Sequence, residues 1–301
     1  MRHRSLPGLT GLLLALALTA LPAASQARII HQENSLYSNI VIDKRGPVLC
    51  LQFSVRRDQR NQSCMNERKP KEMVFDYARM MMASLLIEPE PKRILTLGLG
   101  GGTLPMALDE IFPEVRQDVV EIDPAVVRVA REYFRFAPSE RVNVFAQDGR
   151  VFVKRAATQG ETYDLIMLDA FNGEYIPEHL MTREFLEEVR ALLAPGGVVA
   201  ANTFSISDLY DHESVTYQAV FGPFFNLRTD ASGNRVILAA NGPLPDRAAM
   251  AERAEGLADL LAPYGVEFAP LLDMMDTTPD WDPDAAVLTD QYSPVNLLQG
   301  R

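Results

Sequence analysis

Residues 93–102 read RILTLGLGGG, an apolar run that leads directly into a cluster of glycines. The run RILTL has the length and apolar composition of a strand that is buried in a sheet. Glycines let the chain turn tightly and approach a ligand closely, because they carry no Cβ atom. A helix is expected next, at 104–111. The stretch therefore predicts a nucleotide-binding strand, turn and helix; a turn with only a structural role is the alternative.

Strand and helix patterns alternate beyond this turn. Such alternation predicts a parallel sheet with helices on both faces, the doubly wound α/β class. The C-terminal part continues the pattern and includes a polar, acidic loop at 273–284. The expected strands are 118–122, 142–145, 163–168, 198–201, 224–229 and 235–240, and the expected helices are 124–134, 150–158, 182–193, 213–221 and 246–262.

Residues 28–88 predict a small N-terminal β-hairpin domain and a linking helix ahead of the 89–301 catalytic domain. Short alternating runs are bounded there by turn residues, which is typical of hairpins. The expected elements are strands at 40–42, 48–53 and 62–64, a polar loop at 56–61 and a helix at 71–87.

Residues 1–27 have the pattern of a secretory signal peptide. Arg2 and Arg4 precede a mostly apolar run at 9–21, and the small-residue sequence PAASQA follows. The run is too short for an ordinary transmembrane helix. We expect cleavage before Arg28 and an exported protein, periplasmic or secreted, with no membrane span after cleavage. An uncleaved membrane anchor and a cytosolic helix are the alternatives.

Cys50 and Cys64, the two cysteines of the chain, fall on the two arms of the second expected hairpin. In an exported protein such a pair predicts a disulfide, whereas in the cytosol they would be two unrelated thiols. Two cysteines exclude a disulfide-dense scaffold and a four-cysteine zinc cluster, and the sequence has no metal-binding motif.

The composition is that of a folded globular protein, with 47% hydrophobic and 23% charged residues among 301. The net charge is −11, and removal of residues 1–27, which hold two arginines and no acid, makes it −13. An acidic chain without a basic run is unsuited to nucleic acid, whose binding relies on neutralising phosphates. The acidity favours a small cationic partner instead.

Polar residues and glycines follow each of the first four expected strands of the 89–301 domain. Ligands of open α/β sheets bind beyond the carboxyl ends of the strands. Glu121 lies 23 residues after Gly98, close to the spacing of a ribose-binding acid. Asp148 can accept from an adenine amine, Gly149 leaves space for the ring, and Asp169 ends the fourth strand. The candidate cofactor-binding residues are Gly98, Gly100, Gly101, Glu121, Asp148 and Gly149.

The chemistry of these residues favours a sulfonium compound over a dinucleotide. The third glycine of the dinucleotide fingerprint would fall on Thr103. Several acids crowd the expected site, and they repel a pyrophosphate but attract a cation. We therefore expect S-adenosylmethionine or its decarboxylated form as co-substrate, rather than NAD.

Seven motifs spread along the chain carry a family resemblance. They are ILTLGLGGGTL at 94–104, VVEIDP at 119–124, QDG at 147–149, YDLIMLD at 163–169, LAPGG at 193–197, SLYSNI at 35–40 and LTDQYSPV at 288–295. Together they resemble the spermidine synthase (polyamine aminopropyltransferase) family over nearly all of residues 28–301. The resemblance implies a Rossmann-like S-adenosylmethionine-dependent transferase fold.

The resemblance also implies an activity, transfer of an aminopropyl group from decarboxylated S-adenosylmethionine to an amine such as putrescine. Glu121 would hold the ribose, and Asp148 with Gly149 would contact the adenine. Asp169 would be the catalytic proton acceptor, since a protonated amine cannot attack the carbon next to the sulfonium.

The sequence departs from the family at positions that bind the amine. The second acid of the family's Asp-x-x-Asp-Pro motif is Asn172 here, and Ser38 replaces the glutamine after Tyr37. The acid of the family's glycine loop is missing, and Gly101 stands near its place. The family's Tyr-His-Glu reads Phe-Asp-Tyr, in which Asp76 can replace one missing charge. The candidate substrate-binding residues are therefore Tyr37, Asp76 and Asn172.

Five residues have simpler interpretations. Asp169 can be a structural acid at the end of its strand. Asp123 is as suited to capping the helix that follows it as to contacting a ligand. Trp281 is either a lid residue or packing within its loop. His179 and His212 have no partner at metal-ligand spacing, and we expect no function for them.

Three functions compete. Aminopropyl transfer follows from the resemblance and from Asp169. Methyl transfer from S-adenosylmethionine is favoured by the altered amine-binding positions. A non-catalytic exported polyamine- or nucleoside-binding protein is favoured by the signal peptide, because the co-substrate is made in the cytosol. The expected partner is a small cationic amine, and a homodimer is the assembly we consider.

Overall fold

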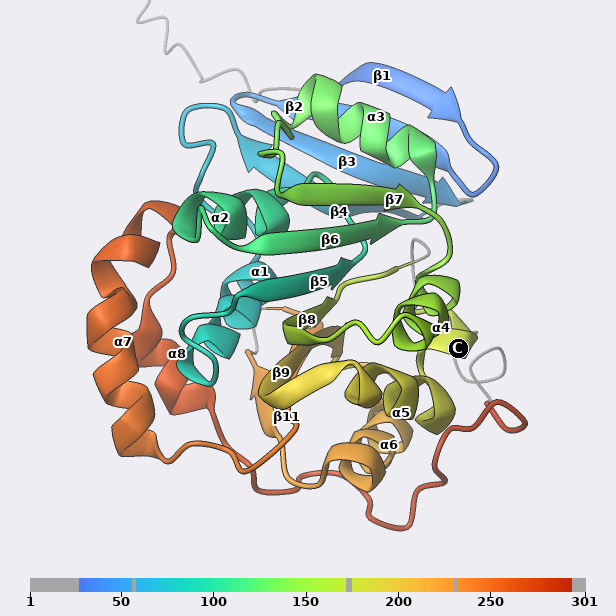
Figure 1. The fold of residues 1–301 in the computed structure, drawn as a ribbon. Coiled ribbons are helices and arrows are strands. Elements are labelled where there is room, and N and C mark those ends of the chain that lie inside the picture. Colours follow the sequence, from blue (N-terminus) through green and yellow to red (C-terminus); the bar gives the residue numbers. More distant parts are fainter. Residues whose placement is uncertain (1–26, 56–57, 172–174, 230–231, 294–301) are drawn as a thin grey trace, which may run out of the picture.

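The computed structural model describes residues 27–55, 58–171, 175–229 and 232–293, which form two sheets with helices packed on them. Figure 1 shows the smaller sheet, β1 to β4, at one end of the larger one. Residues 1–26 of the expected signal peptide lie outside the described residues. Within the described ranges, no helix is both long and apolar enough to cross a membrane.

The N-terminal sheet is fully antiparallel, in the order β1-β2-β3-β4. Two expectations for this region were wrong: β1 was not foreseen, and the expected loop at 56–61 contains the start of β4. Most side chains of β1 are exposed, so its sequence lacks the alternation that identifies a half-buried strand. The strands are β1 Arg28–Asn34, β2 Asn39–Arg45, β3 Val48–Val55 and β4 Asp58–Asn66.

The linking helix is shorter than expected. It consists of α1 Asp76–Met81 followed by the 3-10 turn η1 Met82–Leu86, so the expected start at residue 71 was wrong. The segment before α1 is held by the 3-10 turn η3 Ala262–Tyr264, where the amide of Met73 donates to the carbonyl of Tyr264. That tertiary contact leaves no pattern in the sequence. The three consecutive methionines, Met80, Met81 and Met82, are all buried in the core.

The larger sheet has seven strands in the order β10-β11-β9-β8-β5-β6-β7. The five strands from β7 to β9 are parallel, as expected, whereas β11 runs antiparallel to β9 and β10. β10 and β11 follow each other without a crossover helix, so they pair as a hairpin. The strands are β5 Arg93–Leu97, β6 Arg116–Glu121, β7 Val142–Ala146, β8 Tyr163–Leu168, β9 Leu193–Phe204, β10 Phe225–Arg228 and β11 Asn234–Ala240.

Helices cover both faces of this sheet, which confirms the doubly wound fold (Figure 1). α1, α2, α7 and α8 pack on one face together with η1, and α4, α5 and α6 pack on the other. The remaining elements are α2 Thr103–Ile111, α3 Pro124–Tyr133, α4 Gly149–Thr158, η2 Glu178–Leu180, α5 Arg183–Ala191, α6 Tyr210–Phe221, α7 Arg247–Leu261, η3 Ala262–Tyr264 and α8 Phe268–Met274.

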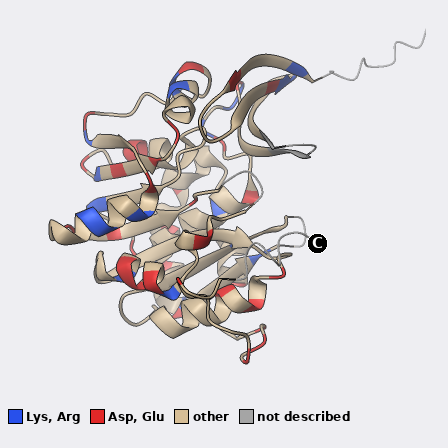
Figure 2. Ribbon diagram, turned by 90° about the vertical axis from the view of Figure 1, so that its right-hand side faces the viewer, with Lys and Arg blue, Asp and Glu red and all other residues tan. Residues whose placement is uncertain are grey.

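α3 joins the two sheets. Its buried side chains Ala125, Val126 and Val129 pack against Ile40, Ile42, Leu49, Leu51 and Met65 of the N-terminal sheet. Since α3 follows β6, this contact brings β4 close to the carboxyl ends of the central parallel strands. Acidic and basic residues are interspersed along the ribbon in the view of Figure 2.

Candidate functional site

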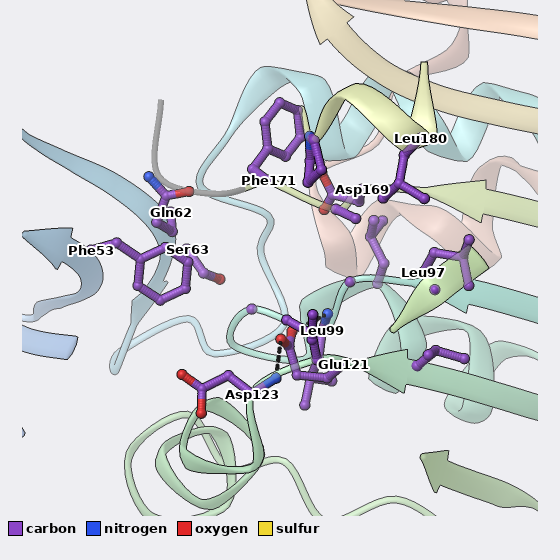
Figure 3. Close-up of a pocket in the computed structure, with 18 of the residues that line it drawn as sticks. Phe53, Gln62, Ser63, Leu97, Leu99, Glu121, Asp123, Asp169, Phe171 and Leu180 are labelled. Atoms are coloured by element: carbon purple, nitrogen blue, oxygen red, sulfur yellow. Dashed lines mark hydrogen bonds between the residues drawn. The ribbon is translucent and has the colours of Figure 1, made fainter. Parts of the chain in front are cut away.

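A cavity of about 260 Å³ lies at the carboxyl ends of β5, β6, β7 and β8. The N-terminal sheet, the segment around α1 and the turn η2 complete its wall. Figure 3 shows Phe53, Gln62 and Ser63 projecting from the N-terminal sheet toward it, across from Asp169 and Phe171. This edge of the sheet is where the sequence predicted a ligand site.

The glycine turn approaches the cavity with two of its glycines. Gly98 and Gly100 line the cavity, and Gly98 has φ +95°. A Cβ atom at Gly98 would lie 2.2 Å from the carbonyl oxygen of Asp169, so only glycine fits there. Gly101 points elsewhere: its Cβ would meet Ser63 Oγ and the ring of Phe134, and it lines a separate cavity of about 200 Å³.

Glu121, at the end of β6, is held by two backbone amides. Its Oε2 accepts from Leu99 N and its Oε1 accepts from Asp123 N, both at 3.0 Å. Burial raises the pKa of Glu121, while these two hydrogen bonds oppose the shift. Each carboxylate oxygen keeps a lone pair for a further donor, so the fixed carboxylate can accept from neighbouring hydroxyls of a ribose.

Asp123 has both of the features considered for it. Its Oδ1 accepts from Ala125 N at 2.9 Å and so caps α3, with Pro124 in the first turn. It also lines the cavity, and its Oδ2 is buried without a hydrogen-bond partner in the described part of the chain.

Asp148 and Gly149 lie where β7 meets α4. Asp148 Oδ1 accepts from Val151 N at 2.9 Å and caps the helix, and Oδ2 lies 2.9 Å from His179 Nε2. A Cβ atom at Gly149 would touch Leu97 at 3.4 Å, so the glycine leaves open space against the cavity floor. His179 was not connected with Asp148 in the sequence, because the two are 31 residues apart and share no motif.

Asp169 lies directly after β8 and is bound from two distant elements. Its Oδ1 accepts from Asn202 Nδ2 of β9 at 2.8 Å, and its Oδ2 accepts from the Tyr77 hydroxyl of α1 at 3.3 Å. Burial raises the pKa of Asp169 to about 7; the two hydrogen bonds lower it and the charge of Glu121 raises it. At neutral pH this carboxyl group can therefore both take up and release a proton.

Tyr77 and Asn202 are kept in the form that donates to Asp169. Burial raises the pKa of Tyr77 well above its usual value, and the charge of Asp169 adds to the shift, so the phenol stays protonated. Asn202 is oriented by Asn234, whose Nδ2 donates to Asn202 Oδ1 at 2.9 Å. The sequence hinted at Asn202 only through its position just after the expected strand at 198–201.

Aromatic and neutral side chains make up the wall opposite the strand ends. Tyr37 lines the cavity and is 48% exposed, and the rings of Phe75 and Tyr77 stack at 5.7 Å. Asp76 is not brought to the cavity; it pairs with Arg79 on its own helix. Asn172, the third candidate for amine binding, lies outside the described residues.

The structure also places Cys50, Cys64 and Trp281, for which the sequence left two interpretations open. Cys50 and Cys64 are opposite each other in β3 and β4, with Cα atoms 4.1 Å apart, and a disulfide joins them. Trp281 is buried and stacks on Phe224 at 5.0 Å, which is packing beneath its loop and not a lid. No group of His, Cys, Asp and Glu suited to a metal ion occurs in the part of the chain that the structure describes.

Comparisons with known proteins show what the whole chain is similar to. Residues 74–222 match the family described as Spermine/spermidine synthase domain. The chain is 49% identical over 292 residues to a polyamine aminopropyltransferase of Vibrio vulnificus (strain CMCP6), covering 96% of this chain and 98% of that protein.

Two solved structures share the fold. A probable spermidine synthase from Corynebacterium glutamicum ATCC 13032 has a TM-score of 0.66 at 22% identity, covering 88% of this chain and 98% of that one. Human methyltransferase-like protein 13 in complex with SAH has a TM-score of 0.57 at 27% identity, covering 72% and 100%. The fold is thus found in both kinds of transferase.

Proposed function

Since this chain belongs to the polyamine aminopropyltransferase (spermidine synthase) family, a family of transferases, we propose that it transfers an aminopropyl group from decarboxylated S-adenosylmethionine to putrescine or a similar amine. The observation that carries the proposal is Asp169, a cavity carboxylate with a pKa raised to about 7. The other acids of the cavity, Glu121, Asp123 and Asp148, add a negative field that attracts both cations.

Asp169 performs the proton transfer in this proposal. Its carboxylate takes a proton from the ammonium group, and the freed nitrogen attacks the carbon next to the sulfonium. The new N–C bond forms as the C–S bond breaks, and methylthioadenosine leaves with the electron pair. Tyr77 and Asn202 hold the carboxylate in place through the hydrogen bonds described above, which favours a near-attack geometry.

Glu121, Asp148 and Gly149 bind the nucleoside part of the donor. The Glu121 carboxylate accepts from the ribose hydroxyls, and Asp148 Oδ2 accepts from the adenine amine beside the space left by Gly149. Gly98 and Gly100 let the backbone of the glycine turn approach the donor closely. Tyr37, which also lines the cavity, contacts the amine in this proposal.

The direct test incubates the purified chain with decarboxylated S-adenosylmethionine and putrescine, and follows methylthioadenosine and spermidine by mass spectrometry. We expect both products in equal amounts. Replacing the proton acceptor in D169N should lower kcat by about 10²- to 10⁴-fold, the usual contribution of a general base. Absence of methylthioadenosine with putrescine and with a panel of other amines would refute the proposal.

Methyl transfer is the second candidate, and one observation favours it: the likeness to the human methyltransferase-like protein, whose structure contains SAH. Calorimetry separates the two, because a methyltransferase should bind the carboxylated donor more tightly than the decarboxylated one. A non-catalytic binding protein would bind an amine or a nucleoside without turnover. In that case the only measurable effect of D169N would be a change in binding affinity.

We also propose export to an oxidising compartment. Support comes from the pattern of residues 1–27 and from the Cys50–Cys64 disulfide, a bond that persists outside the reducing cytosol. Fractionation and the mass of the mature chain test this: we expect a periplasmic or secreted chain that begins at Arg28. A chain retained in the membrane at full length would indicate an anchor instead. Light scattering would test whether the chain forms the homodimer considered from the sequence.

A further inference from the structure

His179 and Gln147 flank Asp148 in the cavity wall, and neither has a role in the transfer step described above. His179 comes from η2, whereas Gln147 follows β7 directly and precedes Asp148 in the chain. The inference drawn from them rests on the proposed function in one respect, the binding of the donor's adenine at Asp148.

His179 fixes the side chain of Asp148. A carboxylate only accepts, so the 2.9 Å contact requires the proton on His179 Nε2. With Oδ1 bound to Val151 N and Oδ2 bound to His179, the carboxylate is held at both oxygens. Oδ2 still has a lone pair, whose direction is set by the histidine.

His179 is itself held by a buried arginine. The Arg150 Nη1 donates to the carbonyl oxygen of His179 at 3.2 Å. Arg150 in turn forms paired hydrogen bonds to Glu188 of α5, both at 2.9 Å, and to Asp290 of the C-terminal segment at 2.7 and 2.8 Å. Such bidentate pairs are the strong and geometrically specific ones. The backbone of His179 is therefore tied to α4, α5 and the segment around Asp290.

Gln147 supplies a donor next to this acceptor. Its Nε2 atom is buried and has no hydrogen-bond partner in the described ranges. Leaving a buried donor without an acceptor is unfavourable, so such a group is generally satisfied by a ligand or water. Gln147 and Asp148 are consecutive residues that both line the cavity, so the cavity has a free amide donor on one and a carboxylate acceptor on the other.

That pair matches one edge of adenine. The 6-amino group donates and the neighbouring ring nitrogen N1 accepts, whereas a 6-oxopurine has an acceptor and an N1–H donor in the same places. We propose that His179 is a positioning residue that aims Asp148 at the 6-amino group, and that Gln147 donates to N1. Together the two residues select an adenine nucleoside against its 6-oxo analogue.

The test measures nucleoside binding to the full chain by calorimetry, without amine and without turnover. The probes are 5′-methylthioadenosine and 5′-methylthioinosine, which differ at the purine 6-position. We expect the wild type to prefer the adenosine compound about tenfold or more, since each contact is exchanged for a repulsive one. A wild type that binds both nucleosides equally, or neither, would overturn the inference.

Variants separate positioning from general stability. H179A should lose most of the preference by binding methylthioadenosine more weakly while methylthioinosine binding stays the same, and H179Q, which keeps an N–H donor, should restore it in part. Q147M should lower the preference too. H212A is the matched control, because His212 bonds the carbonyl of Ala286 away from the cavity. Equal weakening of both nucleosides in H179A would show a structural role only.

These outcomes are distinct from failure of the proposed function. If the chain selects the adenosine compound through His179 but transfers no aminopropyl group, the inference holds and the proposed activity is wrong. If the chain makes spermidine but H179A leaves the preference intact, the proposed activity holds and the inference is wrong.

Discussion

Removal of the hydrogen bond from Asn202 to Asp169 should move the pH dependence of the reaction. Asn202 Nδ2 donates to Asp169 Oδ1 at 2.8 Å, and this bond lowers the pKa of a carboxyl group that burial has raised to about 7. A hydrogen bond to a charged group contributes about 1.5–3 kcal/mol. At 1.36 kcal/mol for each pKa unit, its loss in N202L should raise the pKa of Asp169 by about 1–2 units.

The assay is the single-turnover rate of methylthioadenosine formation at saturating donor and amine, from pH 5 to pH 10. The wild-type rate should rise with a midpoint near pH 7 as Asp169 loses its proton. The N202L midpoint should lie at about pH 8–9, so that its rate at pH 7 is about 5- to 50-fold lower but recovers in alkaline buffer. Protonation of the amine itself affects both proteins equally.

Two controls make the result specific. N143A removes another amide-to-carboxylate bond, from Asn143 to Asp118 at 2.9 Å outside the cavity, and should leave the midpoint unchanged. N234A removes the bond that orients Asn202 and should shift the midpoint less than N202L, in the same direction. If N202L is slower at every pH with an unmoved midpoint, Asn202 does not tune Asp169 and the reasoning is wrong.

Three further predictions concern stability. Between its ordinary pKa and about 7, folded Asp169 holds a proton that the unfolded chain releases, so its contribution to stability falls as the pH rises through this window. The Tm of D169N should therefore fall less than the Tm of the wild type between pH 5 and pH 8. An equal fall in both proteins would contradict this. Replacing Cys50 and Cys64, 14 residues apart, by serine should lower the free energy of unfolding in urea by about 3 kcal/mol, whereas an unchanged midpoint would show that the bond does not constrain the unfolded chain. Arg235 is fully buried and pairs with Glu213 at 2.9 Å, so R235A should cost about 3–5 kcal/mol in the same titration by leaving an unpaired buried acid; a cost below 1 kcal/mol would refute this.

The fold was predictable wherever burial leaves a local pattern. β5 and β8 have the expected bounds, because a strand covered on both faces is an unbroken apolar run that ends where the chain turns. β11 was expected as a strand, but its antiparallel direction follows from its pairing with β10, the strand before it, and not from its own residues. β1 was missed because an exposed edge strand needs few apolar residues.

The candidate site was predictable on the side of the strand ends. Glu121, Asp148, Gly149 and Asp169 share one cavity because parallel strands all deliver their carboxyl ends to the same edge of the sheet. Asp76 was the opposite case: its charge suggested amine binding, but it pairs with Arg79 three residues later on the same helix. A residue's type does not determine the direction of its side chain.

The sequence by itself determined the βα order, the glycine turn and the set of acids at the strand ends, since each is a local pattern or a consequence of parallel topology. Only the tertiary structure decided how those acids are tuned. Tyr77 and Asn202 reach Asp169 from 92 and 33 residues away, and His179 reaches Asp148 from 31. Such contacts depend on how the linking helix, β9 and η2 pack around one sheet edge, and no spacing along the chain encodes that packing.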